Sequence, residues 1–144
     1  MKGSNKQKLI YIYTKFHRLN KSQYWFLMKT DLSYLREMSG GNKELVLEMI
    51  TIFREQVSEF SIEMDKHLAS RDYESLGKLA HKAKSSVSIM GLSDLATDLK
   101  DLENLARDGK KPESYAGIVE NFKHTSAIAL QELEVVSANI ELYF

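Results

Sequence analysis

The stretch "KELVLEMITIFREQVSEFSIEMDKHLA", residues 43–69, decides the fold class. Its apolar side chains recur at steps of three and four, so they form one stripe along a helix. A stripe on a helix of this length must be covered by other parts of the chain. The stretch therefore predicts a long amphipathic helix from about Lys43 to Ala69, with its stripe at Val46, Met49, Phe53, Val57, Phe60 and Met64.

Three further stretches have the same period. Asp72 is the expected N-cap of a helix that runs to Met90, and Gly91 suits the left-handed position that closes it. Ser93 is expected to cap the next helix, and Pro112 suits the first turn of the last one. The three stripes are Leu76, Ala80, Ala83, Val87 and Met90; Leu95, Leu99, Leu102 and Ala106; and Tyr115, Ile118, Phe122, Ala129, Leu133, Val136 and Ile140.

A short helix is expected before these four. Asp31 is its expected N-cap, it extends to about Met38, and "SGGN" (residues 39–42) ends it. Four amphipathic helices joined by short turns bury their stripes against one another, and short turns favour antiparallel neighbours. We therefore predict an all-α fold, an antiparallel four-helix bundle with a short N-terminal helix, over residues 30–144.

Composition limits the class of protein. The 144 residues, 43% of them hydrophobic, suit one domain. The chain has no cysteine, which excludes disulfides and thiolate metal sites. No apolar run approaches the roughly 20 residues of a membrane span. We expect a cytoplasmic monomer.

Residues 1–29 form a basic, aromatic N-terminal segment. Its first 28 residues carry six basic and no acidic side chains, although the net charge of the whole chain is zero. A contact with nucleic acid or an anionic membrane is one interpretation. An added helix, a disordered leader and non-native sequence are the alternatives, and together they are favoured, so no nucleic-acid partner is expected.

His81 lies within "AHKAKSSVSI", residues 80–89. At about 100° per residue it falls roughly 140° from the apolar stripe, which predicts that it faces solvent. The same solvent face is predicted to carry Gly77, Lys78, Lys84, Ser85 and Ser88. Small side chains one turn away on both sides, at positions 77 and 85, leave the ring open to a partner. Lys78 and Lys84 are placed to favour an anionic group on the ring.

An exposed imidazole is suited to phosphotransfer, because its ordinary pKa of about 6.5 leaves much of it neutral and nucleophilic. The spacing alone equally fits an ordinary histidine on a lysine-rich surface. The remaining histidines, His17, His67 and His124, lack partners at metal-ligand spacing, and Glu63 with His67 is the nearest pair. We expect no metal site.

Two long stretches resemble a known family. "LAHKAKSSVSIMGLSDLATDLKDLENLARDG", residues 79–109, is similar to the histidine-containing phosphotransfer (HPt) domain of two-component relays. "DLSYLREMSGGNKELVLEMITIFREQ", residues 31–56, resembles the opening helices of that family, and the resemblance extends over about residues 30–140. It implies that His81 is the phosphoacceptor and that Lys84 helps to hold the phosphoryl group. Ser85 stands where the family often has glycine, and Ala83 where a larger apolar residue is common.

The resemblance also implies the partners and the chemistry. They are response-regulator receiver domains, a hybrid histidine kinase, or both, with Gly77, Lys78, Ser85 and Ser88 as partner contacts. The expected protein is a phosphocarrier that has no kinase activity and no cofactor of its own, while the receiver partner carries magnesium. The alternative is a non-catalytic helical adaptor that binds a partner through the same face.

Overall fold

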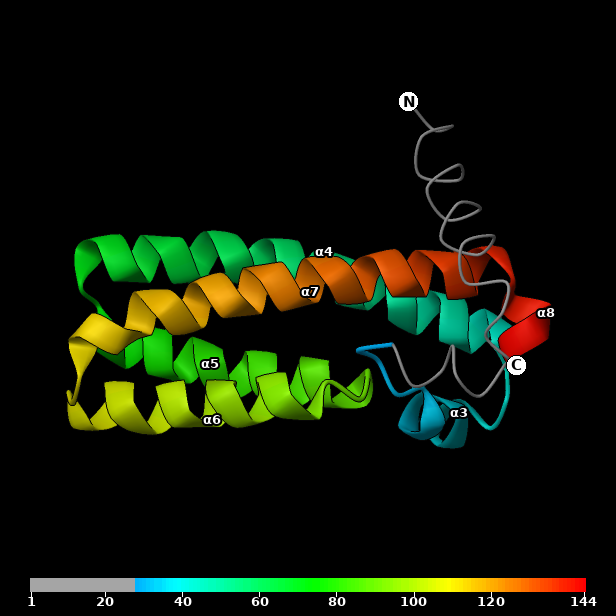
Figure 1. Ribbon diagram of the computed structural model, residues 1–144, viewed down its shortest axis with the longest axis horizontal. Helices are drawn as coiled ribbons and strands as arrows, with labels where there is room; N and C mark the ends of the chain where they lie inside the picture. The colour runs from blue at the N-terminus through cyan, green and yellow to red at the C-terminus, as the bar shows by residue number, and fades with distance from the viewer. Residues whose placement is uncertain (1–27) are drawn as a thin grey trace, which may run out of the picture.

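The computed structural model describes residues 28–144, which are helical and contain no strand (Figure 1). The predicted segment 1–29 falls almost wholly outside these residues. The described helices are α3 (Ser33–Ser39), α4 (Lys43–Ser70), α5 (Tyr73–Ile89), α6 (Ser93–Asp108), the 3-10 turn η1 (Pro112–Ser114), α7 (Tyr115–Ala138) and α8 (Ile140–Tyr143). The predicted all-α class is confirmed.

The four long helices lie side by side, and successive helices run in opposite directions (Figure 1). Helix α5 packs against α4 and α6, and α7 packs against the same two helices from the other side. One hydrophobic core fills the space between them. Helices α3 and α8 lie together at one end of the bundle (Figure 1).

The predicted stripes form most of this core, with small changes of phase. All the stripe residues assigned to α5 and α6 are buried, including Met90, which follows the last residue of α5. In α4, Met49 is half-buried while Ile50 is buried, and in α7 Val119 is buried while Ile118 is half-buried. A helix packed between two neighbours buries a wider sector than a single row of side chains, so residues beside the stripe enter the core.

Side chains at the helix ends explain where the helices begin. The Asp72 carboxylate accepts a hydrogen bond from the backbone N–H of Ser75 (3.1 Å), which confirms Asp72 as the N-cap of α5. The predicted cap at Ser93 is wrong, because α6 already begins at Ser93 and Leu92 precedes it without a side-chain cap. Asp31 lies one residue before the N-cap position of α3, although its carboxylate does accept from the backbone N–H of Ser33 (3.0 Å).

The chain joins the bundle through a tight contact at the end of α5. Gly91 has φ of +71°, and a Cβ there would clash with the backbone of Asp31, so this position requires glycine. The Asp31 N–H donates to the Met90 carbonyl (3.1 Å). Just upstream, the Glu132 carboxylate of α7 accepts the backbone N–H groups of Lys29 (2.6 Å) and Thr30 (3.0 Å).

The C-terminal residues hold α3 in place. The Arg36 guanidinium donates to the Tyr143 carbonyl (2.7 Å) and lies 5.2 Å from the centre of the Phe144 ring. Lys43, at the start of α4, forms an ion pair with Glu141. The short helices therefore form a cap that closes one end of the bundle.

Candidate functional site

Helix α5 presents His81 on the solvent side of the bundle. Ala80 and Ala83 are fully buried on the opposite side of the helix, whereas the His81 side chain is 61% exposed. The structure thus places the ring where its helical phase predicted, and a partner has direct access to it.

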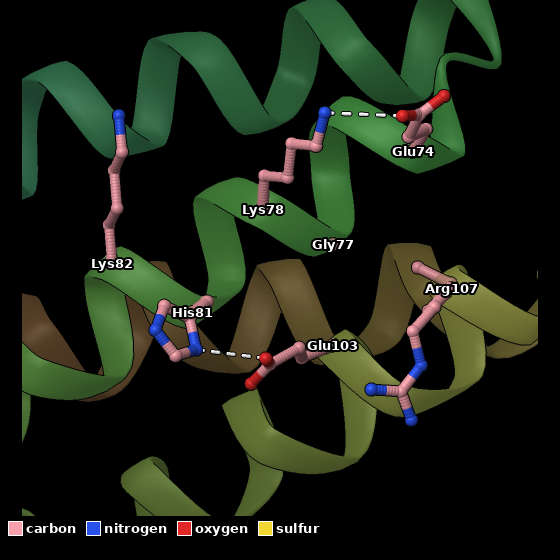
Figure 2. Close-up of a pocket in the computed structure, with 8 residues that line it drawn as sticks. Glu74, Gly77, Lys78, His81, Lys82, Glu103 and Arg107 are labelled. Carbon is pink, nitrogen blue, oxygen red and sulfur yellow. Dashed lines mark hydrogen bonds and ion pairs between the residues drawn. The ribbon is translucent and has the colours of Figure 1, made fainter.

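Glu103 on α6 binds the His81 ring. Its Oε1 lies 2.8 Å from His81 Nδ1 (Figure 2). Its Oε2 lies 3.5 Å from Lys84 Nζ. An ionised carboxylate is an acceptor only, so Nδ1 carries the proton and donates it to Glu103. The neutral ring then has its unprotonated lone pair on Nε2, which is the nitrogen that points away from Glu103.

The charge state of Glu103 follows from these contacts. Partial burial raises the pKa of Glu103, but the hydrogen bond and charge of His81, together with those of Lys84, act more strongly in the other direction. The net result is a pKa below the ordinary glutamate value, so Glu103 remains an acceptor at neutral pH.

The lysines around His81 are in different environments. Lys84 is directed to Glu103, the carboxylate that also binds His81. Lys78 is directed away from the ring and pairs with Glu74 (3.1 Å), so the structure does not bring it to His81 as its spacing suggested (Figure 2). Lys82 is exposed and forms no ion pair within residues 28–144.

Gly77 does not lie on the solvent face, and this prediction is wrong. It is buried one turn before His81, where α5 contacts α6 next to Ala106. An idealised helical phase places it about 100° from the centre of the stripe, among the solvent-facing residues, but α6 packs over that side of α5. Ser85 and Ser88 are exposed as predicted, and the Ser88 hydroxyl donates to the Lys84 carbonyl (2.7 Å).

His81 stands on a ridge between two grooves. The groove between α5 and α6, about 750 Å³, is lined by residues that include Gly77, Lys78 and Glu103. The groove between α4 and α5, about 690 Å³, contains Ser85 and an apolar part made by Met49, Ile52, Ile89 and neighbouring residues. Both grooves include His81, so approach from either side leads to the same imidazole.

A family model for the Hpt domain matches residues 48–138, which include the whole of α5 and α6. This chain belongs to the Hpt domain family. The family mediates phosphotransfer in two-component systems, which implies receiver domains or kinases as partners. No curated protein and no solved structure matches the chain.

Glu103 is the residue of this Hpt domain that the sequence did not single out. It follows the buried Leu102 on α6 and is 22 positions away from His81 in the sequence. The sequence held one indication of its role: Glu103 is a carboxylate beside the apolar stripe of α6, the helix that follows the one carrying His81. That signal does not reveal the contact, which depends on how α5 and α6 are aligned.

The other histidines of the Hpt domain lie apart from this site. His67 on α4 and His124 on α7 line neither groove, and His17 lies outside the described residues. Within residues 28–144, no group of three histidine, aspartate or glutamate side chains is arranged to hold a metal ion. None of the described helices is both long and apolar enough to cross a membrane.

Proposed function

We propose that this Hpt domain relays a phosphoryl group between receiver-domain aspartates through Nε2 of His81. One observation carries the proposal: Glu103 engages Nδ1 at 2.8 Å while the ring is 61% exposed. The ring therefore offers an accessible, unprotonated nitrogen in a fixed orientation, which is what a covalent nucleophile requires.

The transfer step follows from this arrangement. The Nε2 lone pair attacks the phosphorus of an aspartyl phosphate, the N–P bond forms, and the bond from phosphorus to the aspartate oxygen breaks, which leaves a free carboxylate on the receiver. The Nδ1 proton stays on the ring, so the ring becomes positively charged as the N–P bond forms. The Glu103 carboxylate, which accepts the hydrogen bond from Nδ1–H, offsets this charge. A second receiver aspartate takes the group by the reverse reaction.

Charge stabilisation is divided between the two proteins. Magnesium on the receiver neutralises the oxygens of the phosphoryl group during in-line transfer, and the Hpt domain needs no cofactor of its own. On the Hpt side, Lys84 is the lysine that contacts the carboxylate holding His81. We assign it to phosphoryl stabilisation.

The docking surface is the exposed part of α5 and its two grooves. Ser85 and Ser88 leave space for a receiver near Nε2, Lys78 offers a charge at the rim, and Gly77 leaves the base of the α5–α6 groove without a side chain. The domain acts in the cytoplasm as a monomer. A helical adaptor that binds receivers without accepting phosphate is the competing function.

The deciding experiment incubates the Hpt domain with a radiolabelled, phosphorylated receiver domain. We expect an acid-labile label on the parent protein and none on His81→Gln, while His124→Gln, an exposed histidine on α7, is labelled like the parent. Label that persists in His81→Gln contradicts the assignment. Receiver binding without any label on the parent supports the adaptor.

A further inference from the structure

Gly77 occupies the interior of α5, where glycine is a poor choice for helix stability. Glycine loses more backbone freedom on folding than alanine does, and Gly77 adopts the ordinary helical conformation, so no special backbone angle requires it. The reason for a glycine at this position must therefore lie in what surrounds it.

The surroundings of Gly77 are the residues that position Glu103. A Cβ at position 77 would lie 3.4 Å from the Glu103 carbonyl oxygen and 3.4 Å from the Ala106 Cβ. Both distances lie at the boundary between tight and ordinary van der Waals contact, so a methyl group takes up all the space between the helices and its neighbours give way by up to a few tenths of an ångström. Both neighbours belong to α6, and one of them is the backbone of Glu103 itself, so a side chain at position 77 pushes Glu103 away from α5.

Both contacts of Glu103 respond to such a shift. Its bond to His81 Nδ1 is 2.8 Å long and would lengthen toward the upper end of the usual range of about 2.7–3.2 Å. Its contact with Lys84 Nζ is already at 3.5 Å, so the same displacement weakens it further.

We propose that Gly77 is a positioning residue for phosphotransfer: the absence of a side chain at position 77 lets α6 approach α5 closely enough for Glu103 to hold Nδ1–H of His81. Gly77 itself touches neither the ring nor the phosphoryl group. Its effect on transfer rests on the proposed function, whereas its effect on the His81–Glu103 hydrogen bond does not.

The chain offers a matched control. Gly117 also lies within a helix, α7, but nothing is found within 4 Å of the Cβ that alanine adds there. Gly77→Ala and Gly117→Ala therefore make the same chemical change and give the same gain in helix propensity. They differ in whether α6 is displaced.

The test compares these two variants of the full chain by the ¹⁵N chemical shifts of the His81 ring and by single-turnover phosphoryl transfer. For Gly77→Ala we expect a weaker Nδ1–H signature and transfer slower by up to roughly threefold, because one charge-assisted hydrogen bond is lengthened. Gly117→Ala keeps the parent signature and the parent rate. A purely structural role for Gly77 leaves both readouts unchanged.

A rescue variant completes the test. Ala106→Gly in the Gly77→Ala background removes one of the two short contacts, so we expect part of the Nδ1–H signature and of the rate to return. A Gly77→Ala protein with the parent's ring shifts overturns the proposal. If Gly77→Ala does not fold, the double variant decides instead. It keeps the contact with the Glu103 carbonyl, so its His81–Glu103 bond is expected to be less occupied than the parent's, and equal occupancy overturns the proposal.

The NMR readout also separates this inference from the proposed function. A parent protein that accepts no phosphate refutes the relay, but its ring shifts still report whether Gly77 positions Glu103. Conversely, a parent that is labelled at His81 and a Gly77→Ala variant that is unchanged retain the relay and refute the role of Gly77.

Discussion

Replacement of Glu103 by alanine or by glutamine separates the two effects that its carboxylate has on His81. Alanine removes the acceptor of Nδ1–H altogether. Glutamine keeps an acceptor oxygen of similar reach but removes the negative charge. If the carboxylate both fixes the proton on Nδ1 and favours the charge that develops on the ring during attack, glutamine preserves the first effect and loses the second.

The size of each effect follows from the exposure of the pair. Hydrogen bonds to charged groups contribute about 1.5–3 kcal/mol, and the lower end applies because the His81 ring is 61% exposed. About 1.5 kcal/mol corresponds to roughly a tenfold slower transfer for Glu103→Ala. A neutral hydrogen bond is about half as strong, so we expect roughly a threefold loss for Glu103→Gln.

The assay is single-turnover transfer from a phosphorylated receiver domain, followed by rapid quench at a saturating concentration of the Hpt domain. Asp101→Ala, an exposed acidic residue on the same helix, is the matched control and keeps the parent rate. Circular dichroism checks that each variant has the parent's helix content. A Glu103→Ala protein that transfers at the parent rate, or a glutamine variant slower than the alanine variant, refutes the reasoning.

Three further predictions concern single residues elsewhere. Lys84→Ala slows the same single-turnover transfer severalfold without a change in thermal stability, because the Lys84 side chain lies off the core; an unchanged rate removes it from the site. Tyr115→Phe lowers the free energy of unfolding in urea by about 1 kcal/mol, because the buried hydroxyl lies 2.8 Å and 2.6 Å from two carbonyl oxygens at the end of α6. Hydrogen bonds from the Ser75 side chain and backbone lower the pKa of Asp72, so its cap contributes fully above the ordinary value of 3.8 and is lost as the pH falls through the lowered pKa. Asp72→Asn keeps a capping oxygen, and its thermal midpoint therefore falls less on acidification than that of the parent; equal falls contradict this.

Features set within a single helix could be predicted from the sequence. The core positions of α5 and α6 follow from a period of 3.6 residues, and the Asp72 cap follows from a local hydrogen bond. The exposure of His81 has the same origin, because a residue far from the apolar stripe cannot reach the core. The prediction of Ser93 as an N-cap is wrong, although a cap is also a local feature, because serine is equally compatible with the first residue of a helix.

Features that depend on two helices could not be predicted. The phase of Gly77 on α5 predicts the solvent face, and only the position of α6 decides that it is buried. Glu103 reaches His81 through the same contact. The pair of Lys78 with Glu74 is different, because it lies within α5 at a spacing of four residues that the sequence does show. Sequence periodicity gives the direction of each side chain from its own helix axis, but it does not give the distance or the alignment between axes.

The hydrogen bonds from Lys29 and Thr30 to Glu132 have a mechanical consequence. They attach the start of the bundle to α7, whereas His81 is carried by α5. A load applied through any sequence or fusion partner ahead of residue 28 is borne first by the Glu132 carboxylate. The next contact along the chain is the bond from Asp31 to Met90 at the end of α5, so tension at that end of the chain strains the attachment to α7 before it reaches the helix of His81.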